Sequence, residues 1–422
     1  MLDPSDRAQV IAWRGFVSAA YGADRSWTAP VLELLDRALA GSPVDVNSTA
    51  WSAAMQRHQA QIPLTGCINQ VWEVWRHYMP DRPDIWDDIL RKGWKDPKLD
   101  LDFRYDRHQG TPPSGVPSEE DLIMGKELDK LHLLGVTALV ADVPEVPGFP
   151  THIMKHGVVP KLDLAFRYDL HQGSPPSGTP SEEDLIMGRE LDKLNLLGVT
   201  ALVADVPEVP GFPTHIMKHG VVPKLDEDGY PSGEHRMILR GRHASSNENV
   251  PSFSGPTDSQ FAEFLRLDSY LFRADGKKMF HQFRARQSQS QLMRFYHPVT
   301  GELYCYLAMC MGISGGSRVA QTVTSAIVRW LKSTLATTEF SYCDEFIGGA
   351  MGALPACLRQ AVSTTVKVIL GIKLNWEKTD LSGPSQQRIF LGILADTVRL
   401  RVSPSPGRLR LLREKAQSIL AD

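Results

Sequence analysis

Two carboxylates in the last third of the chain have the type and the spacing that nucleotidyl transfer needs. Asp275 follows a strand-like run at 270–274, and Asp344 lies between the apolar flanks of a hairpin-like stretch at 340–347. Acids at the ends of two strands can meet in space and hold divalent cations, because Mg²⁺ prefers hard oxygen ligands. Either acid alone is also compatible with a solvated turn, so it is the pair that predicts a metal site.

A glycine-rich stretch and an aromatic side chain lie between the two acids. Glycines within 311–321 let backbone approach a ligand closely, just before a helix predicted over 319–331. The stretch lacks the GxxxxGK[ST] pattern, which excludes a P-loop. Phe280 could lie under the sugar of a nucleotide, with a core aromatic as the alternative.

Basic residues complete the set of groups that suit a polyanionic partner. Arg236, Arg240 and Arg242 are separated by even steps, so they share one face if a strand predicted over 236–240 continues. Guanidinium groups on one face suit phosphates, and a solvated face is the alternative. Lys378 could donate a proton to leaving pyrophosphate, or it is simply exposed. Net charge is positive over 227–422 and negative before it, which also favours a nucleic-acid partner.

In this order the motifs resemble those of a retroelement reverse transcriptase, over roughly residues 190–400, and most closely the LTR or tyrosine-recombinase (DIRS-type) elements. The resemblance implies that 275–282 is motif A, that 311–321 is motif B and that 342–345 is the YxDD box. It assigns a metal ligand to Asp275, Gly276 (through its carbonyl) and Asp344. The remaining roles that it implies are catalysis by Glu345 and Lys378, nucleotide binding by Arg236, Arg242, Gly276, Phe280, Met311, Gly312 and Gln321, and a primer grip at Phe390, Leu391 and Gly392.

The resemblance implies an α+β fold, a right-hand polymerase with fingers and palm, an antiparallel palm sheet and a mostly helical region before it. The implied activity is RNA-directed DNA polymerisation with two Mg²⁺ ions, or Mn²⁺ in their place, from dNTP onto a primed RNA or DNA template. Two residues depart from the family pattern, since Glu345 replaces the second Asp of the box and Arg240 replaces a fingers Asp. An inactive remnant that binds nucleic acid and an interaction protein built on the acidic N-terminal part therefore stay open.

Composition and repeats set the remaining expectations. Five cysteines without a CxxC pair, a polar start and no long apolar run predict an intracellular reducing location, cytoplasmic or nuclear, and no membrane span. Residues 97–159 recur nearly unchanged at 160–222. Within the second copy, Ser181 and Gly198 predict the start and the end of a helix. The predicted parts are a helical N-terminal region of unknown role (1–96), two repeat copies (97–159 and 160–226), fingers and palm (227–395) and the start of a thumb (396–422).

Overall fold

The computed structural model describes residues 2–20, 25–47, 50–95, 175–209, 216–225, 230–239, 257, 260–261, 264–379 and 382–421. The first repeat copy, Arg240 and Arg242 lie outside these ranges, and the predictions about them stay predictions. The described residues belong to one compact unit, an α+β arrangement of helices and small antiparallel sheets. No helix in these ranges is long and apolar enough to cross a membrane.

The described N-terminal residues are mostly helical. Asp3 caps the first helix, since its carboxylate accepts a hydrogen bond from the Asp6 N–H at 2.7 Å. Trp75 and Trp94 pack in the core of this region, whereas Trp72 and Trp86 are only partly buried. The elements are α1 (Pro4–Ala19), α2 (Arg25–Leu39), α3 (Ala50–Ala60), η1 (Asn69–Val71), α4 (Trp72–Tyr78) and the π-helix η2 (Asp84–Arg91).

The predicted helix of the second repeat copy is α8 (Glu182–Leu196). Ser181 and Asp184 form the reciprocal hydrogen bonds of a capping box, and Gly198 follows the helix with a φ of +67°. Short strands and turns surround this helix. They are β1 (Thr200–Leu202), η4 (Val203–Asp205), β2 (His219–Leu225), β3 (Pro231–Leu239), α10 (Gln287–Leu292), β5 (Arg294–Tyr296) and β6 (Leu303–Tyr306).

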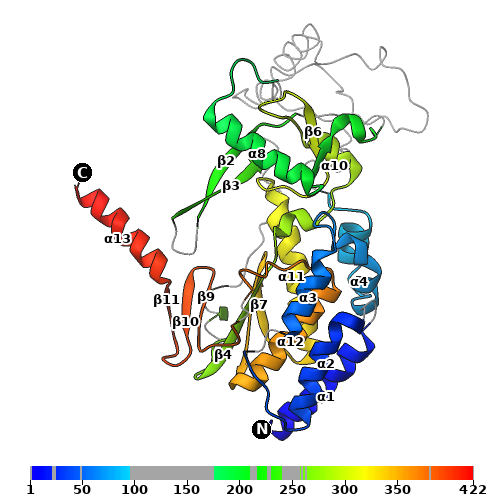
Figure 1. Ribbon diagram of the computed structural model, residues 1–422, viewed down its shortest axis with the longest axis vertical. Helices are drawn as coiled ribbons and strands as arrows, with labels where there is room; N and C mark the ends of the chain where they lie inside the picture. Colours follow the sequence, from blue (N-terminus) through cyan, green and yellow to red (C-terminus); the bar gives the residue numbers. More distant parts are fainter. Residues whose placement is uncertain are drawn as a thin grey trace, which may run out of the picture. The chain divides into compact units, whose positions relative to one another are not determined.

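A three-stranded antiparallel sheet in the order β4-β8-β7 forms the centre of the fold. The strands are β4 (Ser269–Asp275), β7 (Glu339–Tyr342) and β8 (Glu345–Met351), which confirms the predicted strand at 270–274 and the predicted hairpin. Helices α11 (Ser314–Leu335) and α12 (Ala353–Ile369) contact this sheet, and α1, α2 and α3 contact α12 in turn (Figure 1). The predicted helix over 319–331 is therefore confirmed, within a longer one.

A buried ion pair joins α12 to the edge strand of this sheet. The Lys367 ammonium lies 2.7 Å from a carboxylate oxygen of Glu339, and both side chains are fully buried. Lys367 also lies over the ring of Phe346 at 4.6 Å. Burial lowers the pKa of Lys367, while the adjacent Glu339 opposes this change. The charges on this face of the sheet thus neutralise each other.

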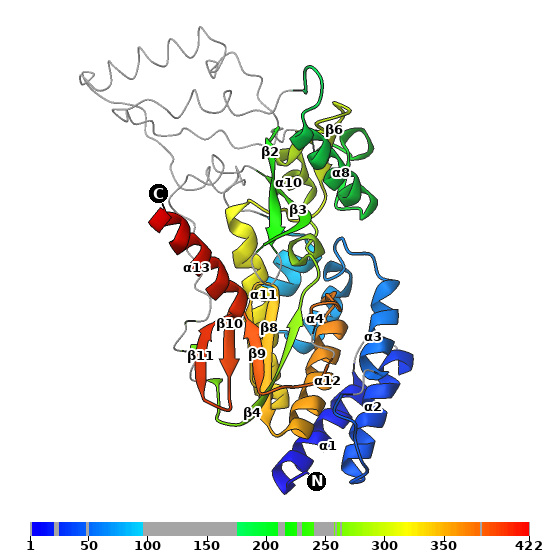
Figure 2. The same ribbon diagram turned by 60° about the vertical axis from the view of Figure 1, so that its left-hand side comes forward.

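A second antiparallel sheet packs against the other face of the central one (Figure 2). Its strands are β9 (Gln387–Phe390), β10 (Ile393–Asp396) and β11 (Arg401–Pro404), followed by α13 (Pro406–Ala421). The hydrophobic cluster between the sheets consists of Phe261, Leu265, Leu271, Ile347, Phe390 and Ala395. This packing brings the β9–β10 turn close to the start of β8.

Gly312 holds the loop before α11 against the end of β3. The Leu239 N–H donates to the Met311 carbonyl at 2.9 Å, and a Cβ added at Gly312 would lie 2.0 Å from the Leu239 carbonyl oxygen. The φ of Gly312 is +97°, which side chains rarely tolerate. Glycine is therefore required here by both space and backbone conformation.

We expect Gly312→Ala to destabilise the chain more than Gly41→Ala. Gly41 also has a positive φ, +71°, but has no atom within 4 Å of an added Cβ. The control should cost about 1–2 kcal/mol from conformation alone, and the clash at Gly312 should add about 1–3 kcal/mol. Urea unfolding of both variants measures the difference. If both variants lost the same free energy of unfolding, β3 would have moved away from the added methyl group without any loss of stability.

Candidate active site

The two predicted metal-binding acids lie at one end of the central sheet. Asp275 is the last residue of β4, and Asp344 lies in the two-residue turn between β7 and β8. The pairing of β4 with β8 sets Asp275 opposite Glu345, so Asp344 directly adjoins the end of β4. The Gly276 N–H donates to the Asp344 carbonyl at 2.7 Å, which fixes the two segments to each other.

Two carboxyl groups of like charge dominate the electrostatics at this end of the sheet. Burial raises the pKa of Asp275 to about 6, repulsion by Asp344 adds to the rise, and Lys378 and the Asn375 side chain oppose it. Burial also raises the pKa of Asp344, which Lys378 and Arg236 oppose. Two carboxylates and a backbone carbonyl are hard oxygen donors that fit Mg²⁺, and a divalent cation would relieve their repulsion.

Glu345, predicted to be catalytic, has a different environment from the other two acids. One of its carboxylate oxygens accepts a hydrogen bond from the Leu391 N–H at 3.2 Å, and the other lies 3.8 Å from the Arg273 guanidinium. Burial raises the pKa of Glu345 to about 7, and both contacts oppose that rise. Within the described ranges, no group of three or more His, Cys, Asp or Glu residues could hold a metal. Glu345 thus tethers the β9–β10 turn to the start of β8.

Gln321, predicted to bind nucleotide, is committed to the β7–β8 hairpin. Its amide nitrogen donates to the Ser341 carbonyl at 3.1 Å, and its amide oxygen accepts from the Cys343 N–H at 2.8 Å. Cys343 has a φ of +52°, a conformation that needs such support in a residue with a side chain. The amide of this 8% exposed side chain is occupied by the turn that carries Asp344, and a nucleotide contact of Gln321 stays a prediction.

The other predicted nucleotide-site residues lie around this acid pair. Phe280 belongs to η5 (Met279–Gln282), and its ring lies 3.2 Å from where a Cβ on Gly316 would be. Arg236 is exposed on β3 and influences Asp344 electrostatically. Lys378 is half-buried and acts electrostatically on both acids. Met311 is fixed through its carbonyl to β3.

The predicted primer grip forms the end of β9 and the turn that follows it. Phe390 is 2% exposed, and its side chain belongs to the hydrophobic cluster between the two sheets. Leu391 and Gly392 both have positive φ, at +51° and +73°, and form the two-residue turn into β10. The turn backbone, tied to Glu345, is the part that a primer could meet.

Three further residues support Asp275, and sequence reasoning missed them. The Asn375 N–H donates to the Asp275 carbonyl at 2.8 Å, and its side chain lowers the pKa of the Asp275 carboxyl. The hydroxyl of Thr379 accepts from the Asp275 N–H at 3.3 Å. Arg273 donates to the Lys378 carbonyl at 3.1 Å. The position of Arg273 two residues before Asp275 on one strand face was a usable signal, whereas the other two depend on long-range contacts.

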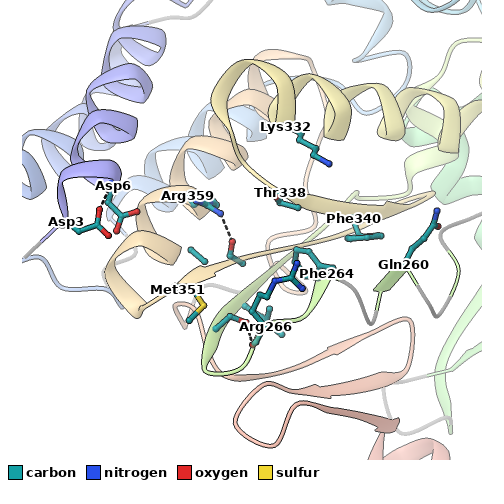
Figure 3. A pocket seen from close by; sticks show the side chains of 14 residues that line it. Asp3, Asp6, Gln260, Phe264, Arg266, Lys332, Thr338, Phe340, Met351 and Arg359 are labelled. Carbon is teal, nitrogen blue, oxygen red and sulfur yellow. Dashed lines mark hydrogen bonds between the residues drawn. The ribbon is translucent and has the colours of Figure 1, made fainter.

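A cavity of about 730 Å³ lies at the opposite end of the same strands (Figure 3). Ser269 and Met351 pair there, and both line the cavity. Six residue steps along the strands separate this pair from Asp275 and Glu345, or roughly 20 Å. None of the predicted site residues lines the cavity, so it is separate from the acid pair.

We expect Gln321→Met to weaken Mn²⁺ binding, because the turn that carries Asp344 loses its support. Gln291→Met is the matched control, since the Gln291 amide similarly bonds the Val209 backbone, at 3.0 and 3.4 Å. Both variants should lose about 1–3 kcal/mol of stability, but only Gln321→Met should lower Mn²⁺ affinity, by about three- to tenfold. Titration followed by electron paramagnetic resonance measures this, and equal affinities would reject the supporting role.

No protein-family model and no curated protein matches this chain. The chain is similar to the solved structure of the foamy viral protease–reverse transcriptase in complex with dsDNA, with a TM-score of 0.42 and 14% identity over 73% of this chain and 59% of that chain. For the dRH form of that protein with ds DNA the TM-score is 0.43, with 14% identity over 69% and 45%. For the native prototype foamy virus protein it is 0.39, with 18% identity over 54% and 28%. The chain thus spans less than two thirds of the length of each, and the similarity is a weak one to a viral reverse transcriptase.

Proposed function

We propose that the chain is a nucleotidyltransferase, an RNA-directed DNA polymerase of the retroelement type with a right-hand fingers and palm. The observation that carries the proposal is the convergence of Asp275 and Asp344 from β4 and the β7–β8 turn. A raised pKa from burial plus a like charge is typical of functional carboxylates. The proposal does not depend on the weak similarity to the foamy virus enzymes.

The proposed roles follow from where each group lies. Asp275, Asp344 and the Gly276 carbonyl would hold two Mg²⁺ or Mn²⁺ ions. When bound, such ions activate a primer 3′-hydroxyl and neutralise the triphosphate. Lys378, close enough to both acids to influence them, would donate a proton to the leaving pyrophosphate.

The remaining surface residues would position the two nucleic-acid substrates. Arg236 on β3 is exposed and lies within electrostatic reach of Asp344, so it suits the phosphates of an incoming dNTP. Phe280 would lie beside the sugar. The Leu391–Gly392 turn, tethered to β8 through Glu345, would set the primer end against the acids. The template would be RNA or DNA.

One observation favours a second candidate. Glu345, which stands where the family has its second Asp of the box, is engaged by the Leu391 N–H, and on this reading the chain would be an inactive remnant that binds primed template without extending it. Binding of a primed template together with no incorporation under any metal condition would select this candidate.

We expect Asp275→Asn and Asp344→Asn each to reduce primer extension by about 10³-fold, because each removes a negatively charged ligand worth several kcal/mol in the transition state. The assay is single-nucleotide incorporation on RNA and DNA templates, with Mg²⁺ and with Mn²⁺. Asp88→Asn, an exposed acid paired with Lys92, is the control and should retain full activity. Undiminished extension by either variant would reject the proposed site.

We expect Glu345→Gln to retain activity within about threefold, because an amide oxygen still accepts from the Leu391 N–H. Glu345→Ala removes the acceptor and should lose about tenfold or more. The comparison separates a tether from a metal ligand, and kcat and KM for dNTP measure it. A loss in Glu345→Gln as large as in Asp275→Asn would show that Glu345 binds metal after all.

A further inference from the structure

A glutamine of the N-terminal helices reaches the segment that carries the supports of Asp275. Gln59 of α3 is 3% exposed. Its amide nitrogen donates to the Ile372 carbonyl at 2.6 Å, and its amide oxygen accepts from the Leu374 N–H at 3.0 Å. Both ends of one amide therefore hold alternate residues of an extended segment, as a neighbouring strand would.

A second glutamine holds the residue between them from the opposite side. The Gln282 amide nitrogen donates to the carbonyls of Lys373 and Lys277, each at 2.8 Å, and its oxygen accepts from the Lys373 N–H at 2.9 Å. The backbone of Ile372, Lys373 and Leu374 is thus bonded on both sides by side-chain amides. A shift of this segment would break several buried hydrogen bonds together.

The held segment leads directly into the groups that surround Asp275. Leu374 forms an isolated bridge with Gly276, and the N–H of the next residue, Asn375, donates to the Asp275 carbonyl at 2.8 Å. Lys378 follows three residues later, and its N–H donates to the Asn375 carbonyl at 3.1 Å. The position of Gln59 therefore determines where Asn375 and Lys378 lie.

The N-terminal region also approaches the start of this loop closely. The Trp75 indole N–H donates to the Leu370 carbonyl at 2.8 Å. Gly371 has a φ of +80°, and a Cβ there would lie 2.6 Å from the Val71 side chain and 3.1 Å from the Cys67 carbonyl. Gly371 thus packs directly against Val71 and the backbone of Cys67, so the loop has little room to move relative to residues 59–75.

We propose that Gln59 is a positioning residue for the active site, acting through Asn375 on Asp275, and that residues 1–96 are an integral part of the catalytic unit. The inference rests on the proposed function for its catalytic consequence. Its structural part, that the Gln59 amide fixes 372–375, stands independently. The sequence alone did not indicate a catalytic role for residues 1–96, because Gln59 lies over 300 positions from the residues it bonds.

The test compares Gln59→Met with Gln9→Met in the full chain. Gln9 of α1 is the matched control, because its amide similarly donates to the Ala336 carbonyl at 3.0 Å and accepts from Arg359 at 3.1 Å. Hydrogen exchange by mass spectrometry over 371–379 reports the loop directly. We expect exchange there to accelerate in Gln59→Met and to remain unchanged in Gln9→Met. If Gln59→Met does not fold, Gln59→Glu keeps the acceptor for Leu374 and removes only the donor.

The same variants separate positioning from a general loss of stability. For Gln59→Met we expect a fall in kcat of about tenfold with KM for dNTP within about twofold, and Mn²⁺ affinity lower by about three- to tenfold. Combining Gln59→Met with Asn375→Ala should add little to Asn375→Ala alone, because the two act in one chain of contacts. Additive losses, or unchanged exchange over 371–379, would overturn the inference. No Mn²⁺ binding and no incorporation by the unmodified chain would instead overturn the proposed function.

Discussion

The antiparallel register of β4 and β8 is the constraint on which the rest of the site depends. Pairing Asp275 with Glu345 brings the β7–β8 turn, and with it Asp344, to the end of β4. A slip by one residue would turn every side chain of a strand to the opposite face. Gly348 resists such a slip, because an added Cβ would lie 2.3 Å from the ring of Phe272 on β4. The close packing of Phe272 on Gly348 thus holds the register of β4 and β8, and this register sets how far Asp275 lies from Asp344.

The central sheet carries two pairs of charged side chains whose electrostatics are opposite. Towards α12, Lys367 and Glu339 lie 2.7 Å apart and compensate each other. At the end of β4, Asp275 and Asp344 repel each other, and Lys378 and Arg236 only moderate that repulsion. A buried pair of opposite charges needs no ligand, whereas a partly buried pair of like charges favours a bound cation. For this reason Asp275 and Asp344, and not Lys367 and Glu339, are the candidate cation-binding site of this sheet.

Local signals made much of this fold predictable. The capping box at Ser181, the strand ending at Asp275 and the hairpin around Asp344 depend on residues within a few positions of one another, and the structure confirms each of these elements. The directions of the Glu345 and Gln321 side chains were not predictable, because their partners, Leu391 and the hairpin backbone, come from distant segments. A family pattern gives the positions of such residues, but hydrogen-bond partners decide what each side chain is free to do. The metal and substrate roles inferred from the resemblance remain predictions.

The contacts of Gln59 have a consequence for synthesis of the chain. They join residues separated by 313 and 315 positions, so α3 leaves the ribosome long before the segment that it holds exists. Until residue 375 emerges, the Asp275 carbonyl lacks the Asn375 N–H that donates to it. A nascent chain can complete its N-terminal helices and the β4 strand early, yet the acid pair acquires its full support only after residues 372–379 have been synthesised. Such long-range closure is typically slow, so assembly of the site lags behind the formation of the local elements.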